Sequence, residues 1–391
     1  MKIKSVSTIQ LKPIDGMRIV VCRIDADNGM YGLGEIGVAI GMGAPAAASM
    51  IEEFAPMVIG MDPLQHEVIW EKMYRQSFWG VGNGAILMSA ISAIDTALWD
   101  LKGKILDLPL YVLLGGKQRP RIRAYASQLQ MGWGVERFTT TESPEALRIA
   151  CRRAIDQGYT AVKANVLGLD RQGNRKAPID TLGYILRDDM NRAEERLAAI
   201  RDEVGPNVDV ILENHCITDV NTAIQFAKMA EPYDIMFLEE PAVPLSAANF
   251  RKIADSTRIP IATGERTFQR LGFLPLVTEG RLSVAQPDIG NCGGVTEFKR
   301  IAELCALYDV GVQAHTCSGP ISVAVALHCE SALTNFIIHE HHVMNTTPHN
   351  IAYGKYNYQP KDGWFETPEL PGIGQELSEH AMSGAVVKTI Q

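Results

Sequence analysis

The sequence predicts a closed barrel of parallel strands, each followed by a helix, preceded by a small α+β domain. From residue 121 onward, short apolar runs alternate with amphipathic segments of helical length. An ionisable residue stands at the end of one run after another, at steps of about 23–27 residues, the length of a strand, a helix and two loops. These residues are Glu213, Glu239, Glu265, Asp288, His315 and Glu340. Only a closed parallel barrel brings residues so spaced to one face.

The first 120 residues have a different pattern and predict a separate α+β domain. Alternating apolar and polar residues predict strands at 3–11, 17–26 and 31–35, with a turn at 27–29. Helical periodicity predicts helices at 45–57, 66–74 and 86–104. We therefore expect an α+β domain at 1–120, a barrel domain at 121–360 and a turn-rich segment at 361–391 that returns to the first domain.

Eight strands and seven helices are expected in the barrel. The strands are predicted at 121–127, 161–165, 208–213, 235–240, 261–264, 284–287, 312–315 and 336–340. The helices are predicted at 144–157, 191–204, 220–230, 247–256, 271–279, 295–308 and 321–333. One connection, 166–190, is longer than the others, and a loop of that length in a compact domain is usually a lid or an interface element.

Composition excludes several classes of protein. The 391 residues carry a formal net charge of −8, which does not favour binding to nucleic acid or to an anionic membrane. The start lacks a signal-peptide core, and no apolar run approaches the roughly 18 residues of a membrane span. Seven scattered cysteines without CxxC spacing predict a reduced, cytoplasmic protein. We expect the chain to form a homo-oligomer. We also expect it to bind a small molecule.

Three carboxylates predict a metal site. Glu213, Glu239 and Glu265 each follow a β-rich run and would repel one another in a low-dielectric site. A hard divalent cation removes that cost, and all-oxygen ligation indicates Mg²⁺, or Mn²⁺, rather than zinc. The alternative is three surface carboxylates that fall in step by chance.

Asp288 and His315 belong to the next two strands and predict a general base. A carboxylate bonded to one imidazole nitrogen sets the tautomer and raises the basicity of the other nitrogen. The alternative is a histidine with a structural role only.

These residues lie in motifs that resemble those of a known family. The motifs are Glu239-Glu240-Pro241, Thr263-Gly264-Glu265, Gln286-Pro287-Asp288 with Gly293-Gly294, and the helix with Asp95 and Leu98 to Lys104. In this order they resemble the enolase superfamily, in particular its mandelate racemase subgroup, over nearly the whole chain. The resemblance implies an α+β capping domain on a modified TIM barrel. It also implies Mg²⁺ bound to a substrate carboxylate, and a base that removes the neighbouring proton.

Three positions refine the expected reaction. Lys163 matches the first lysine of the Lys-x-Lys pair of racemases, but Asn165 stands at the second, so the two-base machinery of racemisation is incomplete. His215 lies two residues after Glu213, and strand alternation would place both side chains on the same side. This pattern resembles the galactonate and mannonate dehydratases, where the histidine is the general acid. The family usually has aspartate where this chain has Glu213.

The expected function is therefore a Mg²⁺-dependent dehydratase that converts a sugar acid (an aldonate) into a 2-keto-3-deoxy acid. His315, oriented by Asp288, would take the C2 proton, and Lys163 would help to stabilise the enediolate. His215 would protonate the departing C3 hydroxyl. Expected substrate-binding residues are Asn165, Glu340, Arg75 and Trp79, and the glycine-rich segments 32–35 and 37–43 resemble capping loops.

Two alternatives to this function remain open. One is a sugar-acid epimerase or cycloisomerase of the same superfamily. The other is a non-catalytic binding protein that kept the fold.

Overall fold

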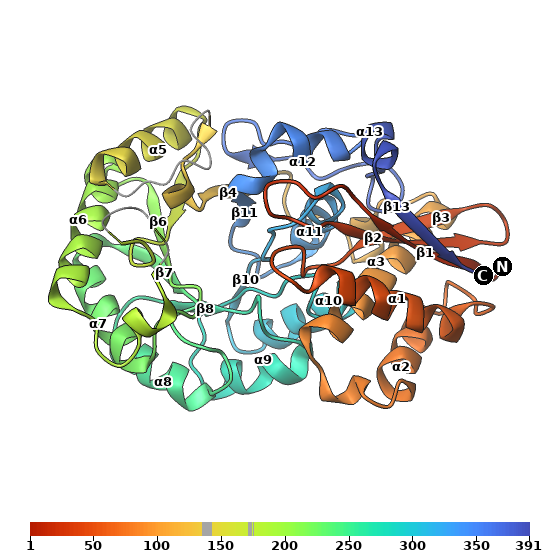
Figure 1. The fold of residues 1–391 in the computed structure, drawn as a ribbon, viewed down its shortest axis with the longest axis horizontal. Coiled ribbons are helices and arrows are strands. Elements are labelled where there is room, and N and C mark those ends of the chain that lie inside the picture. Colours follow the sequence, from red (N-terminus) through yellow and green to blue (C-terminus); the bar gives the residue numbers. More distant parts are fainter. Residues whose placement is uncertain (135–142, 171–173, 175) are drawn as a thin grey trace.

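The chain forms a barrel with a second, smaller sheet domain beside it (Figure 1). The computed structural model describes residues 1–134, 143–170, 174 and 176–391. Part of the long connection, including Arg171 and Arg175, therefore lies outside the described residues. Both chain termini lie side by side at the far end of the smaller domain, because the last strand pairs with the first.

The smaller domain is an antiparallel sheet of order β13-β1-β2-β3. Its strands are β1 (Ile3–Gln10), β2 (Val20–Ala26), β3 (Tyr31–Glu35) and β13 (Val386–Ile390). Its helices are α1 (Ala44–Val58), α2 (His66–Gln76) and α3 (Ala85–Leu106). The predicted strand at 17–26 begins only at Val20, because residues 14–17 form a tight turn closed by an Ile14–Met17 bridge.

Two glycines of β3 allow α3 to lie directly on the sheet. A Cβ at Gly32 would clash with the carbonyl oxygen of Ala97, and one at Gly34 with that of Ala93. Segment 32–35 is therefore a buried strand beneath a helix and not a mobile capping loop. The last residue of this strand, Glu35, emerges at the boundary with the barrel, where it contacts Ser318.

The second sheet is parallel and has the order β10-β9-β8-β7-β6-β5-β4-β11. Its strands are β4 (Ile122–Ser127), β5 (Ala161–Ala164), β6 (Asp209–Glu213), β7 (Ile235–Glu239), β8 (Ile261–Thr263), β9 (Val284–Ala285), β10 (Gly311–Val312) and β11 (His339–His342). A bridge between Val312 and Phe336 joins the two ends of the sheet and closes it. The predicted barrel with an α+β domain is confirmed.

Helices cover the outside of this barrel (Figure 1). They are α5 (Pro144–Asp156), α6 (Arg187–Val204), α7 (Val220–Ala230), α8 (Ala247–Asp255), α9 (Gln269–Thr278), α10 (Gly294–Ala306) and α11 (Pro320–Ala332). Shorter elements are α4 (Leu110–Leu113), α12 (Pro348–Tyr353), α13 (Glu379–Ser383) and β12 (Trp364–Phe365), which pairs with β4. None of the helices in the described part of the chain is both long and apolar enough to cross a bilayer.

The last barrel strand begins later than predicted. Phe336 makes only the isolated bridge to Val312, whereas regular pairing with β4 starts at His339. Glu340 therefore lies inside β11, opposite Tyr125, and not at the end of the strand.

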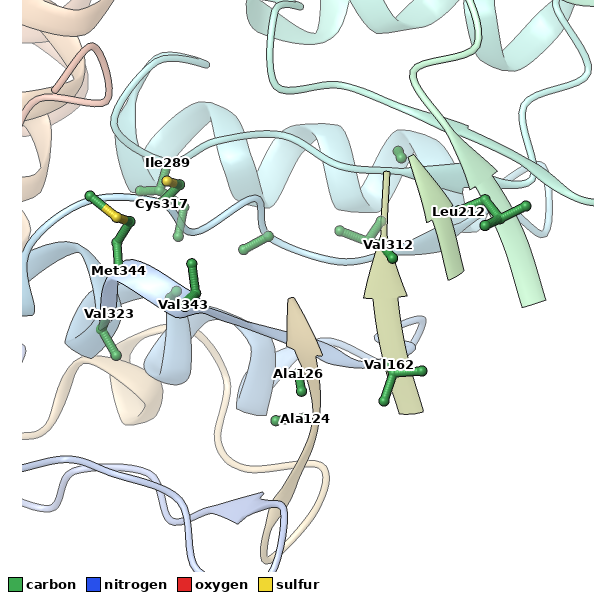
Figure 2. Packing of buried hydrophobic residues seen from close by; sticks show 14 of the residues in the cluster. Ala124, Ala126, Val162, Leu212, Ile289, Val312, Cys317, Val323, Val343 and Met344 are labelled. Atoms are coloured by element: carbon green, nitrogen blue, oxygen red, sulfur yellow. The ribbon is translucent and has the colours of Figure 1, made fainter. Parts of the chain in front are cut away.

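Alternation along the strands sorts side chains into an outer and an inner set. Ala124, Ala126, Val162 and Leu212 belong to the large apolar cluster shared with the surrounding helices (Figure 2). The inner set forms a small separate cluster of Tyr125, Ala161, Ile211, Phe237, Ala262, Val284 and Ile338. Two residues further along the same strands stand Ser127, Lys163, Glu213, Glu239, Gly264, Gln286 and Glu340. Since side chains alternate with period two, this polar layer also faces the barrel interior.

Candidate active site

Three carboxylates converge at the end of the barrel where the strands finish. Glu213 and Glu239 are the last residues of β6 and β7 and stand opposite each other in the register. Glu265 follows β8 after Gly264, where a Cβ would lie 2.5 Å from the backbone of Gln286. One oxygen from each of the three carboxylates lies within 4.8 Å of the other two. An ion ligated at about 2.1 Å, as Mg²⁺ is, can close this triangle with small side-chain shifts.

Lys163 lies among these carboxylates and is 1% exposed. Its Nζ is 2.7 Å from Glu239 Oε1, 2.8 Å from Glu340 Oε1 and 3.2 Å from Glu213 Oε2. Burial lowers the pKa of Lys163, but the three carboxylates outweigh it and raise the pKa well above its usual value. Lys163 is therefore a permanent counter-ion of the acidic cluster, and its contact with a substrate stays a prediction.

One lysine does not neutralise the cluster. Burial raises the pKa of Glu239 to about 8; Lys163 opposes this rise, and the negative charge of Glu213 adds to it. The ionised form of Glu239 is thus unfavourable without a further cation. A divalent ion at Glu213, Glu239 and Glu265 would remove this penalty, so the residues present fit Mg²⁺.

Hydrogen bonds from other strands of the barrel orient the carboxylates. Gln286 Nε2 donates to Glu239 Oε2 at 2.6 Å, and Gln128 donates to Glu213. Ser127 Oγ donates to Glu340 Oε1 at 2.6 Å, and the N–H of Thr316 donates to Oε2 at 3.1 Å. The sequence interpretation gave no role to Gln128, Ser127 or Gln286. The signal that could have found Ser127 and Gln286 is their inward position, two residues beyond an inner apolar residue.

Asp288 and His315 form the predicted pair. Asp288 Oδ2 is 2.7 Å from His315 Nδ1, and Asp288 Oδ1 accepts the N–H of Gly290 at 2.7 Å. Burial lowers the pKa of His315, but Glu265 and Asp288 together hold it well above its usual value. Nε2 of the same ring is 3.4 Å from Glu265 Oε2. With Nδ1 bonded to Asp288, Nε2 is the nitrogen that faces the metal ligands and can exchange a proton there.

His215 reaches the site by a route that differs from the predicted one. β6 ends at Glu213, and His215 and Cys216 adopt left-handed backbone conformations with φ of 47° and 57°. Such conformations cost roughly 1–3 kcal/mol each in non-glycine residues and concentrate at functional sites. This turn brings His215 Nε2 to 2.7 Å from Glu213 Oε1. Strand alternation was thus the wrong reason, although the two side chains do meet.

Asn165 contacts the other nitrogen of the His215 ring. Its Oδ1 accepts the N–H groups of Leu167 and Gly168, so its Nδ2 faces His215 Nδ1, at 3.3 Å. A donor at Nδ1 and a carboxylate at Nε2 both favour a proton on Nε2. Nε2 is therefore the atom from which His215 could deliver a proton.

The structure does not bring Arg75 or Trp79 to this cluster. Arg75 pairs with Glu71 at 2.6 Å, and Trp79 is 77% exposed with its ring edge-on to Phe78. Their role in substrate binding stays a prediction. A second cation, besides Lys163, lies beside the metal ligands: Arg266, which pairs with both Glu240 and Glu265 and which the sequence interpretation missed.

A capped parallel barrel with a carboxylate trio and an Asp–His pair could hold a divalent ion beside a proton acceptor. Comparison with known families identifies the class of protein. Residues 5–115 match the family described as "Mandelate racemase / muconate lactonizing enzyme, N-terminal domain", and residues 146–381 match "Enolase C-terminal domain-like". The chain belongs to the enolase superfamily, in its mandelate racemase subgroup.

Individual relatives cover nearly the full chain. A D-galactonate dehydratase from Pectobacterium atrosepticum is 32% identical over 97% of this chain and 93% of its own length. A solved structure of an enolase superfamily member from Salmonella Typhimurium is 46% identical, with a TM-score of 0.98 and complete coverage of both chains. The 3,6-anhydro-D-galactonate cycloisomerase from Zobellia galactanivorans is 30% identical, with a TM-score of 0.83, covering 99% of this chain and 100% of its own.

Proposed function

We propose that this protein is a Mg²⁺-dependent hydro-lyase that removes water from an aldonate and releases a 2-keto-3-deoxy acid. One observation supports this most directly. Two imidazoles from separate loops lie beside the carboxylate trio. His315 Nε2 is 3.4 Å from Glu265, and His215 Nε2 is 2.7 Å from Glu213. A base and an acid beside one metal site match a reaction that removes a proton and a hydroxyl from adjacent carbons.

The residues would divide the reaction as follows. Mg²⁺ held by Glu213, Glu239 and Glu265 would supply the positive charge that makes a proton next to a carboxylate removable by a neutral base. With the charge of Glu265 neutralised by the ion that it would hold, His315 Nε2 would accept the C2 proton, and Asp288 would stabilise the resulting imidazolium through Nδ1. The C2–H electrons would first move into the substrate carboxylate as an enediolate, and in a second step they would form the C2–C3 double bond as the C3–O bond breaks. His215 Nε2 gives its proton to the departing hydroxyl, and the enol product becomes the 2-keto acid.

Ring opening of an anhydro sugar acid, or epimerisation, is the second candidate. The likeness to a cycloisomerase supports it, since the same acid and base could act on an ether oxygen instead of a hydroxyl. Dehydration and ring opening both yield a 2-keto acid that reacts with semicarbazide, so the substrate separates them: an aldonate in the first case and an anhydro sugar acid in the second. Epimerisation yields no 2-keto acid.

The test is a screen of aldonates, D-galactonate among them, with Mg²⁺ in D₂O. We expect a 2-keto product that carries deuterium at C3 for at least one substrate, and deuterium at C2 of the substrate that remains. His215→Asn should abolish dehydration while C2 exchange persists, because only the leaving step uses this ring. If dehydration survives in His215→Asn, the assignment of the acid is wrong. A wild-type protein that exchanges no C2 proton in any sugar acid would favour the non-catalytic binding protein.

Metal binding is tested separately by thermal unfolding. Mg²⁺ at 100 times its Kd should stabilise the wild type by about 2.7 kcal/mol. Glu239→Gln should lose this response, and Glu279→Gln, a change at an exposed position outside the site, should keep it. An undiminished response in Glu239→Gln would contradict the proposed ligand set.

A further inference from the structure

A short segment of the capping domain touches the loops that follow both members of the Asp288–His315 pair. This segment, Glu35 to Gly37, begins at the last residue of β3. The Glu35 carboxylate contacts residues 318–322, which follow His315 in the chain. The backbone of Gly37 contacts residues 290–291, which follow Asp288.

The Glu35 carboxylate is buried and receives three hydrogen bonds. Oε1 accepts Ser318 Oγ at 2.6 Å and also the N–H of Gly319, and Oε2 accepts the N–H of Ser322 at 3.1 Å. These groups lie at the start of α11, where free N–H groups and the helix dipole favour a negative charge. One carboxylate of the capping domain therefore holds the backbone between His315 and α11.

The backbone after Glu35 holds the other loop. The N–H of Gly37 donates to the carbonyl oxygen of Gly290 at 2.9 Å. Gly290 is the residue whose own N–H binds the Asp288 carboxylate at 2.7 Å. A Cβ at Gly37 would lie 2.5 Å from the Asn291 side chain, so the two segments are in close contact.

We propose that Glu35, together with the backbone of Gly37, positions the Asp288–His315 pair for proton abstraction. The inference rests on the proposed function. The two loops come from different strands, and their side chains meet at 2.7 Å; contact with one rigid strand of the capping domain holds them in register. Glu35 is a positioning residue, since its carboxylate bonds to Ser318, Gly319 and Ser322 and not to the reacting groups.

The position of the contacts predicts a selective effect. The metal ligands Glu213, Glu239 and Glu265 follow β6, β7 and β8, whereas the Glu35 segment contacts loops after β9 and β10. Loss of the Glu35 contacts should therefore disturb the base and leave metal binding intact. A displacement of about 1 Å at a catalytic group can cost on the order of 10²-fold in rate.

The experiment compares Glu35→Gln with Asp100→Asn. Asp100 is also a buried carboxylate of the capping domain, but it accepts the N–H groups of Leu33 and Ile373 and pairs with Lys104, away from the base. We expect Glu35→Gln to lower kcat for C2 exchange by about 10- to 100-fold, with KM and the Mg²⁺ affinity measured by calorimetry within about twofold of wild type. Asp100→Asn should lower Tm without this loss of kcat.

A second measurement needs no turnover. The His315 Nδ1 proton in a 2.7 Å bond to Asp288 should give a low-field proton resonance, assigned by its absence in His315→Asn. Its position should shift in Glu35→Gln and not in Asp100→Asn.

Two outcomes would overturn the inference. One is an unchanged resonance and unchanged exchange rate in a folded Glu35→Gln protein. The other is a loss of C2 exchange rate that is in the same proportion to the loss of Tm in Glu35→Gln and in Asp100→Asn. If the wild type turns over no sugar acid, the proposed function fails, whereas a shift of the resonance would still establish the positioning contact.

Discussion

At the scale of single residues, the site is organised around buried charge. Lys163 binds three carboxylates, and Asp288 and Glu213 each bind an imidazole at 2.7 Å. Gln286 donates to the second oxygen of Glu239, and Ser127 donates to the Glu340 oxygen that Lys163 also contacts. Each group is thus pre-oriented before substrate arrives, which is the condition for electrostatic stabilisation of a developing charge.

Replacement of the base should abolish the first chemical step. In His315→Asn no group remains to accept the C2 proton, and we expect both C2 exchange and dehydration to fall by about 10²–10⁴-fold. The fold should persist, since Asn can still bond to Asp288. Proton exchange followed by NMR in D₂O checks this; exchange at the wild-type rate would show that another group is the base.

Replacement of Lys163 should destabilise the fold, and more so without metal. Lys163→Met leaves buried carboxylates without a counter-ion, which costs about 3–5 kcal/mol in the free energy of unfolding. Saturating Mg²⁺ should recover part of this loss, because it supplies positive charge to Glu213 and Glu239. Urea unfolding with EDTA or with Mg²⁺ measures the difference, with Lys228→Met on the exposed face of α7 as control. If Lys163→Met loses the same unfolding free energy with and without Mg²⁺, Lys163 and the ion do not neutralise the same carboxylates.

At the scale of elements, the capping helix α3 packs against the start of α10 through one carboxylate. Asp95 Oδ2 accepts the N–H of Thr296 at 2.9 Å, and Asp95 Oδ1 accepts its hydroxyl at 2.6 Å. Gly294 makes room for this contact: it has φ of +80°, and a Cβ there would overlap Asp95. The Gly293-Gly294 motif therefore allows close packing between α3 and the start of α10, which we call the joint between the domains, and does not contribute to the metal site.

Gly294→Ala should be more destabilising than its backbone conformation alone explains. Gly41 provides the matched control, with φ of +82° and nothing within 4 Å of an added Cβ. Gly41→Ala should cost about 1–2 kcal/mol for the left-handed conformation. Gly294→Ala should cost roughly 1–3 kcal/mol more because it also overpacks the joint. Denaturant unfolding of both variants measures this, and equal costs would show that the joint adapts freely.

At the scale of the whole molecule, buried acids of the capping domain couple stability to pH. Burial raises the pKa of Asp95 to about 7, although the hydrogen bonds from Thr296 lower it. The unfolded chain releases this proton near pH 4, so between pH 4 and 7 the folded state holds more protons than the unfolded state. Stability contributed by Asp95 is therefore complete below about pH 4 and is lost as the pH rises toward 7.

Asp95→Asn removes the titrating carboxyl group, so the difference in unfolding free energy between wild type and variant should show its pH dependence. The cost of the substitution in unfolding free energy should be larger at pH 5 than at pH 8, by at least about 1 kcal/mol. Comparison of each variant with wild type at the same pH cancels the other titrating groups. A cost that is independent of pH would show that Asp95 is already ionised in the folded protein at pH 5.

Most of the architecture could be predicted because it depends on local patterns. Alternation and helical periodicity located every barrel strand and helix to within a few residues, as for the predicted helix at 220–230, which is α7. The constant spacing of Glu213, Glu239 and Glu265 placed them on successive strands, and the structure brings them together. The route of His215 could not be predicted, since a left-handed turn leaves no periodic signal in the sequence.

The sequence by itself determined the barrel, the attached α+β domain and the regular spacing of six ionisable groups along it, because period, composition and spacing are properties of neighbouring residues. Only the tertiary structure decided how these groups are held. Glu35 and Ser318 are 283 positions apart, and Gln286 reaches Glu239 from a strand two places away in the sheet. Such contacts depend on how the closed barrel and its capping domain stack, and no local pattern in the chain encodes which distant partner a buried polar side chain will meet.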